Sequence, residues 1–410
     1  MKDFLVKAKA CTQQLATLDG KTKNRILNKM ADALEENSTI IVSENAKDMK
    51  EGKENNLDMA LLDRLFLDDA RVSAIAQSLR EIASLKEPVG RVLEGWVTED
   101  NLRIEKVSVP IGVVGVIYES RPNVTSDVAG LCFKSGNVAI LKGGKEAEHS
   151  NIIIAKILQR VLEIHKLPKE MISLLPDSTR EGVAELIKED EYVDLIVPRG
   201  GEGLIKYISQ NSSVPVVKHD KGLCHTYIHR DASQEKAIKI AINAKCQRPG
   251  VCNAMETLLI DHAIARDILP KLYKFFVDAG TKLKGCPKTK HFIFIDNATD
   301  KDYNTEYLSN ELNIKIVESV DEALAHIARF GSGHSEAIIT ENYSAAEKFL
   351  DSVDAACVYV NASTRFTDGG AFGFGAEVGI STNKLHARGP MGINELTTYK
   401  FKIYGNGQVR

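Results

Sequence analysis

The sequence predicts an α/β chain of two domains, and three observations support this. At 410 residues the chain exceeds what one hydrophobic core usually serves. Short, continuously apolar runs alternate with segments of helical periodicity, which is typical of parallel sheets covered by helices. Two further segments, Leu102–Val109 and Thr397–Tyr404, alternate apolar and polar residues as half-buried strands do. These two predict an arm outside the parallel sheets.

The chain up to about Leu85 reads as helical. Apolar residues recur at spacings of three and four, as in Ile26, Met30 and Ala33, with charged residues between them. Pro88 and Gly90 then end the helical region ahead of the first arm strand.

Val113–Tyr118 is continuously apolar and predicts a fully buried strand of a parallel sheet. Ligands of open α/β sheets bind beyond the carboxyl ends of strands, so Arg121 and Asn123 follow this strand at a favourable position. The Asn123 amide could donate to a developing oxyanion. It could equally cap a helix over Val124–Lys134.

Two more strands precede glycine turns. Asn137–Leu141 is followed by K-G-G-K-E-A and a helix through Leu162, and the strand within Tyr192–Ile205 leads into P-R-G-G-E-G. Gly200 and Gly201 would let the backbone approach a pyrophosphate at the start of a helix, although the G-x-G-x-x-G spacing is absent. Three strand–loop–helix units in a row predict a doubly wound cofactor domain.

Beyond a further strand at Val214–Val217, the pattern repeats. A helix over Ser233–Lys245 is followed by the strand T-L-L-I, a helix over Ile264–Ala279, and the strands H-F-I-F-I and I-K-I-V. We therefore expect a cofactor domain over 1–229, with an arm strand near 100–110. A catalytic α/β domain over 230–365 and a return segment with an oligomerisation strand over 366–410 complete the expected organisation.

Cys252 is the candidate nucleophile. It follows Pro249 and Gly250, which break regular structure and allow the backbone to approach a substrate closely. A thiolate forms thioesters readily, which suits reduction at the level of a carboxylic acid. The alternative is a small buried core residue, because free cysteine is commonly buried.

Composition excludes several classes of protein. Lys and Arg total 53 against 56 Asp and Glu, so the formal charge is −3, and no basic cluster suggests nucleic acid. Seven cysteines without paired spacing argue against a disulfide framework, and the adjacent Cys224 and His225 are a weak zinc signal, so we expect no metal. No long apolar run or signal sequence is apparent. A soluble, cytoplasmic protein is expected, with no membrane or nucleic-acid partner.

The order of Asn123, K-G-G-K, V-P-R-G-G, Cys252 and T-E-Y-L-S resembles the aldehyde dehydrogenase superfamily over nearly the whole chain. Three long stretches are similar to the γ-glutamyl phosphate reductases, also called glutamate-5-semialdehyde dehydrogenases. They are Y-E-S-R-P-N-V-T-S-D, Q-R-P-G-V-C-N-A-M-E-T and T-D-G-G-A-F-G-F-G-A-E-V-G-I-S-T-N-K-L-H-A-R-G-P-M-G. The resemblance implies an aldehyde dehydrogenase-like fold and NADPH-dependent reduction of L-glutamyl 5-phosphate in proline biosynthesis.

The resemblance also implies residue roles. Cys252 would displace phosphate, Asn123 and the Cys252 N–H would form the oxyanion hole, and Lys142 and Glu306 would hold the two riboses of the cofactor. Three arginines, with their individual roles open, would hold the phosphate and the α-carboxylate of the substrate: Arg121, Arg248 and Arg365.

Two positions refine this expectation. Hydrolytic relatives carry a water-activating glutamate where this chain reads K-H-D-K-G at 218–222, and its loss agrees with reduction. Lys145 stands where NAD-dependent relatives often place a carboxylate, and a cation there favours the 2′-phosphate of NADPH. The alternatives are that Lys145 is solvated and that Glu146 faces the ribose.

The arm implies a homodimer or homotetramer. The resemblance also implies a functional association with glutamate 5-kinase, since some relatives fuse the reductase to a glutamate kinase. The alternative functions are those of a CoA-acylating aldehyde dehydrogenase and of a catalytically silent binding subunit of the same fold. Both leave Cys252 or its surroundings under-explained.

Overall fold

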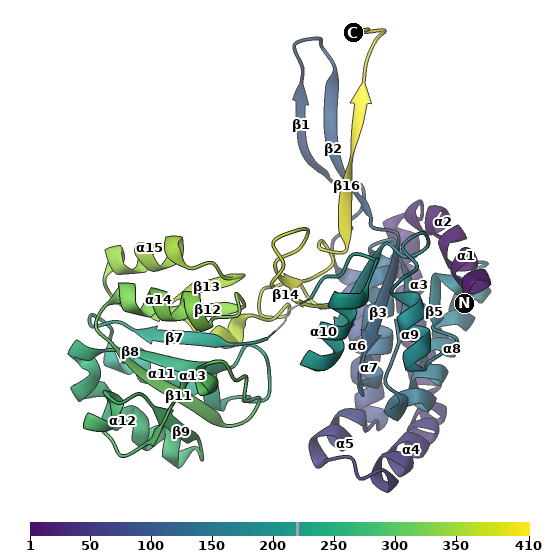
Figure 1. Cartoon of the computed structure of the whole chain (residues 1–410). Helices are drawn as coiled ribbons and strands as arrows, with labels where there is room; N and C mark the ends of the chain where they lie inside the picture. The colour runs from purple at the N-terminus through teal and green to yellow at the C-terminus, as the bar shows by residue number, and fades with distance from the viewer. Residues whose placement is uncertain (219–220) are drawn as a thin grey trace. The chain divides into compact units, whose positions relative to one another are not determined.

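A computed structural model of the chain describes residues 1–218 and 221–410. Its contacts divide the chain into two compact units (Figure 1). Unit 1 comprises 1–218, 373–379 and 391–410, and unit 2 comprises 219–372 and 380–390. The bounds of these two units differ from the expected domain ranges of 1–229, 230–365 and 366–410. The expected ranges describe functional domains and stay a prediction. Each unit is described by itself.

Unit 1 contains a four-stranded parallel sheet in the order β5-β4-β3-β6. Every residue of β3 is buried, as the apolar run at Val113–Tyr118 predicts. The strands are β3 (Val113–Tyr118), β4 (Val138–Lys142), β5 (Ile172–Leu174) and β6 (Leu195–Arg199). The order of strands reverses between β3 and β6, which is where ligands of doubly wound sheets bind.

Helices make up most of the rest of unit 1, and the helical prediction for the first 85 residues is confirmed. They are α1 (Lys2–Ala10), α2 (Thr12–Ala16), α3 (Gly20–Glu36), α4 (Ser38–Glu54), α5 (Met59–Leu65), α6 (Asp69–Ser84), α7 (Pro122–Lys134), α8 (Glu148–Ile164), α9 (Arg180–Leu186) and α10 (Glu202–Asn211), with short 3₁₀ turns η1 (Lys145–Ala147) and η2 (Lys169–Met171).

The predicted arm is an antiparallel sheet in which β2 lies between β1 and β16 (Figure 1). Its strands are β1 (Val92–Val97), β2 (Arg103–Pro110) and β16 (Thr397–Tyr404). The pairing of β2 with β16 confirms the arm, and β1 adds a strand that the sequence analysis did not identify. The two short strands β14 (Gly379–Ser381) and β15 (Gly389–Met391) pair with each other where the chain passes between the units.

Unit 2 contains a seven-stranded sheet in the order β10-β9-β11-β8-β7-β12-β13, and all its pairings are parallel. Its strands are β7 (Cys224–Ile228), β8 (Met255–Asp261), β9 (Lys282–Gly285), β10 (Asp296–Asn297), β11 (Glu311–Val317), β12 (Ser335–Ile339) and β13 (Cys357–Val360). Its helices are α11 (Gln234–Cys246), α12 (His262–Asp278), α13 (Asp300–Tyr303), α14 (Val320–Phe330) and α15 (Tyr343–Ser352), with turns η3 (Thr289–His291) and η4 (Thr364–Phe366).

Helices cover both faces of this second sheet. Leu258 of β8 packs in a core with α11 and α12, while its neighbour Leu259 packs in a second core with α14 and α15. Successive side chains of a strand point to opposite faces, so the continuous apolar run T-L-L-I serves two cores at once. The α/β fold of parallel sheets covered by helices, which the sequence predicts, is therefore confirmed.

Two predicted strands are wrong. Val214–Val217 makes only an isolated bridge between Val216 and Ile196, because Pro215 lacks the N–H that a longer ladder needs. H-F-I-F-I forms the end of η3 and a bend, with Phe294 95% exposed. The isoleucines of that run pack against the core beside β9 without pairing in the sheet, which explains its strand-like composition.

A buried ion pair joins α11 to β8, the two elements that flank the Cys252 loop. The Lys245 ammonium donates to Glu256 at 2.8 Å, and both side chains are almost completely buried. Burial raises the pKa of Glu256 to about 7, although Lys245 opposes the shift. Removing one partner would leave the other charge buried without its counter-ion.

We predict that Glu256→Gln destabilises the protein by about 3–5 kcal/mol, and that the double replacement Lys245→Met/Glu256→Leu costs less. Urea unfolding measures both. Lys236→Met is the control, since it removes an exposed ion pair with Glu341 from the same helix and should cost at most about 1 kcal/mol. A Glu256→Gln effect no larger than that control would contradict the prediction.

Candidate active site

Cys252 lies in a short irregular loop between α11 and β8 and is partly exposed. The segment that leads into β7 packs against this loop. The Sγ of Cys224 donates to the Cys252 carbonyl oxygen at 3.2 Å. A Cβ added at Gly222 would lie 2.5 Å from the Cα of Cys252 and would overlap its carbonyl group. Gly222 is therefore required for the loop to rest where it does.

Asn253 fixes the loop from the other side. Its buried side-chain amide donates to the Thr367 carbonyl at 2.8 Å, and its own carbonyl accepts from the Thr364 hydroxyl at 2.8 Å. The sequence analysis did not identify Asn253 as a functional residue. Only its position next to Cys252 could have indicated this role from the sequence, because its hydrogen-bond partners lie more than 100 residues away.

Two of the three predicted arginines lie beside Cys252 in unit 2. The Arg365 guanidinium donates to Gln247 at 3.1 Å and also to the Asn253 side chain. Burial and repulsion by Arg248 lower the pKa of Arg365, while attraction from Cys252 opposes the shift. Two guanidinium groups near the Cys252 thiol form an anion-binding environment.

This loop lies at the amino edge of its sheet. Gly222 precedes β7, Cys252 precedes β8 and Ser332 precedes β12, and the Ser332 hydroxyl accepts from the Leu223 N–H at 3.0 Å. Glu306 lies in the irregular segment that precedes β11. Burial raises the pKa of both Glu256 and Cys224, and the Glu306 charge adds a smaller contribution to each, so Glu306 also lies near this edge.

Arg121 and Asn123 lie in unit 1, at the start of α7. The helix begins at Pro122 with Arg121 in the N-cap position, and Asn123 lies within the first turn. The alternative that Asn123 caps this helix is therefore wrong. Its side-chain amide instead donates to Asp127 at 3.0 Å, one turn along the helix. Asp127 went unnoticed in the sequence, although an acidic residue within an apolar helix is a signal in itself.

Lys142 and Lys145 line one cavity of about 240 Å³ in unit 1, at the carboxyl ends of β4 and β5. Gly143, Gly144, Pro176 and Ser178 also line it. Burial lowers the pKa of Lys142, and Lys145 adds to this while Glu146 opposes it. The contribution of the loop after β5 was missed, although the apolar run before Pro176 could have indicated a strand.

Lys145 and Glu146 differ in what they face. Lys145 is exposed and lines the cavity, whereas Glu146 accepts from the Ser120 hydroxyl at 3.2 Å. This geometry favours Lys145 over Glu146 as the residue that faces the ribose.

The turn after β6 already holds a carboxylate. The Gly201 N–H, which opens α10, donates to Glu119 at 3.0 Å, and a Cβ at Gly200 would lie 2.7 Å from the same carboxylate oxygen. Glu119 directly follows β3, so this contact occupies the point where the strand order reverses. It is the position that the sequence analysis assigned to a pyrophosphate.

Three further sequence-based expectations concern the K-H-D-K-G stretch, metal binding and membrane spans. The K-H-D-K-G stretch includes residues 219 and 220, which lie outside the described residues, so the absent glutamate is a statement about sequence alone. Within 1–218 and 221–410, no group of three His, Cys, Asp or Glu side chains is arranged to hold a metal ion. Over the same part of the chain, no helix combines the length and apolarity that crossing a membrane requires.

Comparisons with known proteins agree with this geometry. Residues 1–284 match the model of the aldehyde dehydrogenase family. The chain is 66% identical to the γ-glutamyl phosphate reductase of Nitratiruptor sp. over 411 residues, and 66% identical to that of Sulfurimonas denitrificans over 410 residues. Both alignments cover 100% of each chain.

Solved structures extend the comparison. The crystal structure of γ-glutamyl phosphate reductase from Thermotoga maritima matches with a TM-score of 0.98 and 44% identity, covering 100% of this chain and 99% of that one. Glyceraldehyde-3-phosphate dehydrogenase GapN from Methanocaldococcus jannaschii, complexed with NADP, matches with a TM-score of 0.71 and 18% identity, covering 99% and 94%. The latter likeness shows the fold alone.

The close contact under Cys252 gives a prediction. Gly222→Ala should displace the loop, and displacement of a reacting group by about 1 Å can lower the rate about a hundred-fold. Alkylation of Cys252 by iodoacetamide, followed by peptide mass spectrometry, measures the change in the thiol. Gly95→Ala in β1 is the control, because its Cβ would meet only a carbonyl oxygen at 3.6 Å. Unaltered labelling and turnover in Gly222→Ala would contradict the role given to this contact.

Proposed function

Since the chain belongs to the aldehyde dehydrogenase family, and its full-length relatives are γ-glutamyl phosphate reductases, we propose that it reduces L-glutamyl 5-phosphate to L-glutamate 5-semialdehyde and phosphate. This is the second step of proline biosynthesis from glutamate. The observation that carries the proposal is the partly exposed Cys252 with Arg248 and Arg365 beside it. A thiol and two guanidinium groups suit an acyl phosphate, which offers a carbonyl carbon and a dianionic leaving group.

In the proposed reaction, the Cys252 thiolate forms a bond to the C5 acyl carbon. The bond from that carbon to the phosphate oxygen breaks, and its electron pair leaves with the phosphate, so a thioester remains on Cys252. Arg248 and Arg365 bind the departing phosphate through charge-assisted hydrogen bonds. The oxyanion that forms on the acyl oxygen accepts from the Asn123 amide and the Cys252 N–H. Arg121, two residues before Asn123 in sequence, is a further candidate for binding the substrate.

NADPH, when bound, supplies a hydride to the thioester carbon. The carbon–sulfur bond then breaks, its electron pair returns to Cys252 as the thiolate, and the aldehyde is released. Lys142 and Lys145 would hold the adenosine ribose and its 2′-phosphate, and Glu306 the nicotinamide ribose. Gly200 and Gly201 would hold the pyrophosphate, which would have to displace the Glu119 carboxylate from the Gly201 N–H. Both lysines line the cavity of about 240 Å³ at the carboxyl ends of β4 and β5, which supports their proposed roles. NADP bound to GapN from M. jannaschii supports the same class of cofactor on this fold.

The arm supports assembly into a homodimer or homotetramer. Its outer strands expose large apolar side chains, among them Trp96, Val97, Phe401 and Ile403, with Val97 63% and Ile403 60% exposed. Apolar edge strands of this kind pair or pack against another chain in stable proteins. We further propose functional association with glutamate 5-kinase, because an acyl phosphate is reactive and must be consumed soon after it forms.

The activity test is a coupled assay with glutamate, ATP, a glutamate kinase and NADPH, and its reverse is phosphate-dependent oxidation of glutamate 5-semialdehyde. We predict that Cys252→Ala abolishes both while NADPH binding and the unfolding midpoint are retained, and that Cys252→Ser also fails because a hydroxyl is the poorer nucleophile. Cys246→Ala, at the other partly exposed cysteine, is the control and should stay active. More than a few per cent of activity in Cys252→Ala would remove this thiol from the mechanism.

Cofactor preference gives a second prediction. Lys145→Glu should weaken NADPH about ten- to hundred-fold relative to NADH, because a charge-assisted hydrogen bond of about 1.5–3 kcal/mol is lost and the carboxylate repels the 2′-phosphate. The ratio of kcat/KM for the two cofactors measures this. Lys169→Glu makes the same change of charge at an exposed position of unit 1 and should leave the ratio unchanged. An unaltered ratio in Lys145→Glu would make Lys145 a bystander.

A further inference from the structure

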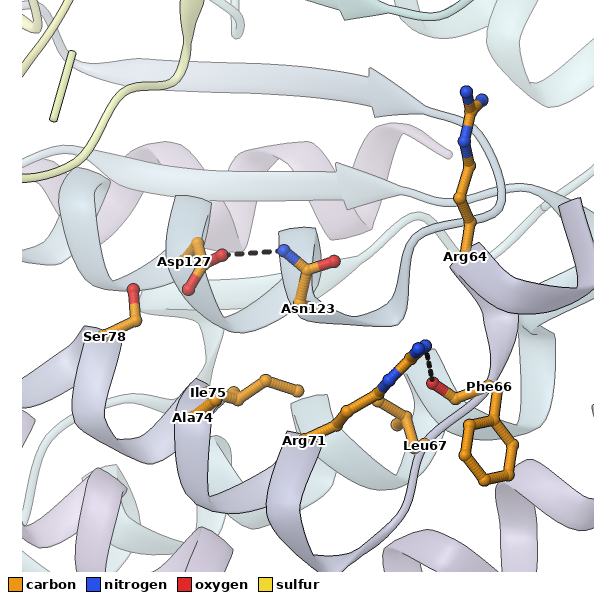
Figure 2. Close-up of a pocket in the computed structure, with 9 residues that line it drawn as sticks. All are labelled: Arg64, Phe66, Leu67, Arg71, Ala74, Ile75, Ser78, Asn123 and Asp127. Atoms are coloured by element: carbon orange, nitrogen blue, oxygen red, sulfur yellow. Dashed lines mark hydrogen bonds between the residues drawn. The ribbon is translucent and has the colours of Figure 1, made fainter. Parts of the chain in front are cut away.

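A second cavity of about 250 Å³ lies within unit 1, between α5, α6 and the start of α7 (Figure 2). Asn123 and Asp127 of α7 line one wall, and Arg64 and Arg71, from α5 and α6, line another. The cavity thus contains the residue proposed to stabilise the oxyanion, together with three charged side chains that have no role in the reaction as described so far.

The Asp127 carboxylate is incompletely satisfied. Its Oδ2 accepts from Asn123, but its Oδ1 is buried and has no hydrogen-bond partner among the residues that the structure describes. Burial raises the pKa of Asp127, with a smaller contribution from the Glu81 charge, while Ser78 and Asn123 oppose the shift. A buried carboxylate oxygen in a cavity wall is most favourably satisfied by a cation that donates a hydrogen bond.

The arginine side of the cavity carries the opposite charge. Arg71 is held in place, because it donates to the Asp63 carboxylate at 2.7 Å and to the Phe66 carbonyl at 3.0 Å. Arg64 is exposed, and no ion pair involves it in the described part of the chain. Figure 2 shows Asp127 and Asn123 side by side, with the two arginines on the side of the cavity away from Asp127. One carboxylate and two guanidinium groups that line the same cavity match the opposite charges of a zwitterionic α-amino acid.

We propose that this cavity binds the α-amino acid end of the glutamyl substrate, with Asp127 accepting from the α-ammonium and Arg64, supported by Arg71, binding the α-carboxylate. The inference rests on the proposed function and adds to it the residues that select an α-amino acid.

The spacing on α7 agrees with the length of the substrate. Asn123 and Asp127 are four residues apart, so their side chains are separated by about one turn, or about 5.4 Å along the helix. The glutamyl chain places three carbon–carbon bonds between its acyl carbon and its α-carbon. An asparagine amide has two N–H donors, so Asn123 can donate one to Asp127 and retain the other for the acyl oxygen.

The test compares variants on three aldehydes in the oxidative direction. Glutamate 5-semialdehyde carries both the amine and the carboxylate, glutarate semialdehyde lacks the amine, and 4-aminobutanal lacks the carboxylate. Asp127→Asn should lower kcat/KM about ten- to hundred-fold for the two amines, chiefly through KM, and leave glutarate semialdehyde within about three-fold of the wild type. Arg64→Gln should weaken the two acids and leave 4-aminobutanal unchanged.

Glu81→Gln is the matched control, because Glu81 acts on Asp127 only through its charge and does not line the cavity. It should affect all three aldehydes alike and by less than about three-fold. An equal loss on all three in Asp127→Asn would mean that Asp127 only orients Asn123, and this would overturn the proposal. Unchanged kinetics in either cavity variant would overturn it as well.

Calorimetry separates this proposal from the proposed function. Wild-type protein should bind L-glutamate at least about ten-fold more tightly than glutarate, and Asp127→Asn should lose that preference. Wild-type protein that shows the preference but no reductase activity would refute the proposed function and leave the amino acid site standing. Active protein without the preference would refute the amino acid site alone. If Asp127→Asn does not fold, Arg64→Gln provides the test, since Arg64 is exposed.

Discussion

Parallel strand pairing is the constraint on which both units depend. Parallel neighbours need a long crossover between them, so each strand is followed by a helix and each sheet is buried on both faces. The continuously apolar strands β3 and β8 satisfy this requirement in units 1 and 2 respectively. Because like ends of the strands then meet at one edge, each sheet offers an edge of loops on which polar side chains gather.

The two sheets use opposite edges. In unit 1 the candidate residues lie at the carboxyl ends of the strands, since Lys142 is the last residue of β4 and Gly201 follows β6. In unit 2 they precede them, since Cys252 comes before β8 and Gly222 before β7. The usual rule places ligands beyond the carboxyl ends of strands, and unit 2 departs from it. The departure explains why Cys252 depends on Gly222 and Asn253, because the loops at this edge must pack on one another to stay in place.

The sequence allowed much of the fold to be predicted where a local pattern decides the structure. Val113–Tyr118 and Thr397–Tyr404 are the strands β3 and β16 to the residue. The pattern misleads where composition and pairing disagree. Val214–Val217 looks like a strand but contains Pro215, and β9 is a strand although Leu283 is its only large apolar residue. In these cases tertiary pairing overrides what composition favours.

The residues of the candidate site likewise fall into those that the sequence predicts and those that only tertiary contacts identify. Cys252 and Asn123 carry chemistry in their own side chains and can be recognised in short motifs. Asn253 and Asp127 matter through contacts, and neither the partner of Asn253 at Thr367 nor the cavity beside Asp127 can be read from neighbours in the sequence. Arg121, Arg248 and Arg365 look equivalent in sequence, whereas the structure groups Arg365 with Arg248 and Cys252.

The path of the chain has a consequence for biosynthesis. Unit 1 begins the chain but is closed by residues 391–410, after the whole of unit 2 has been made. Its strand β16 pairs with β2, from which it is separated by nearly 300 residues, as in the partners Thr398 and Val109. On a ribosome, β2 therefore emerges long before β16 exists, and the edge that later pairs with β16 must stay protected from other nascent chains in the meantime. Unit 2 is encoded almost without interruption, so it can complete its sheet during translation, and the arm becomes the last part of the protein to mature.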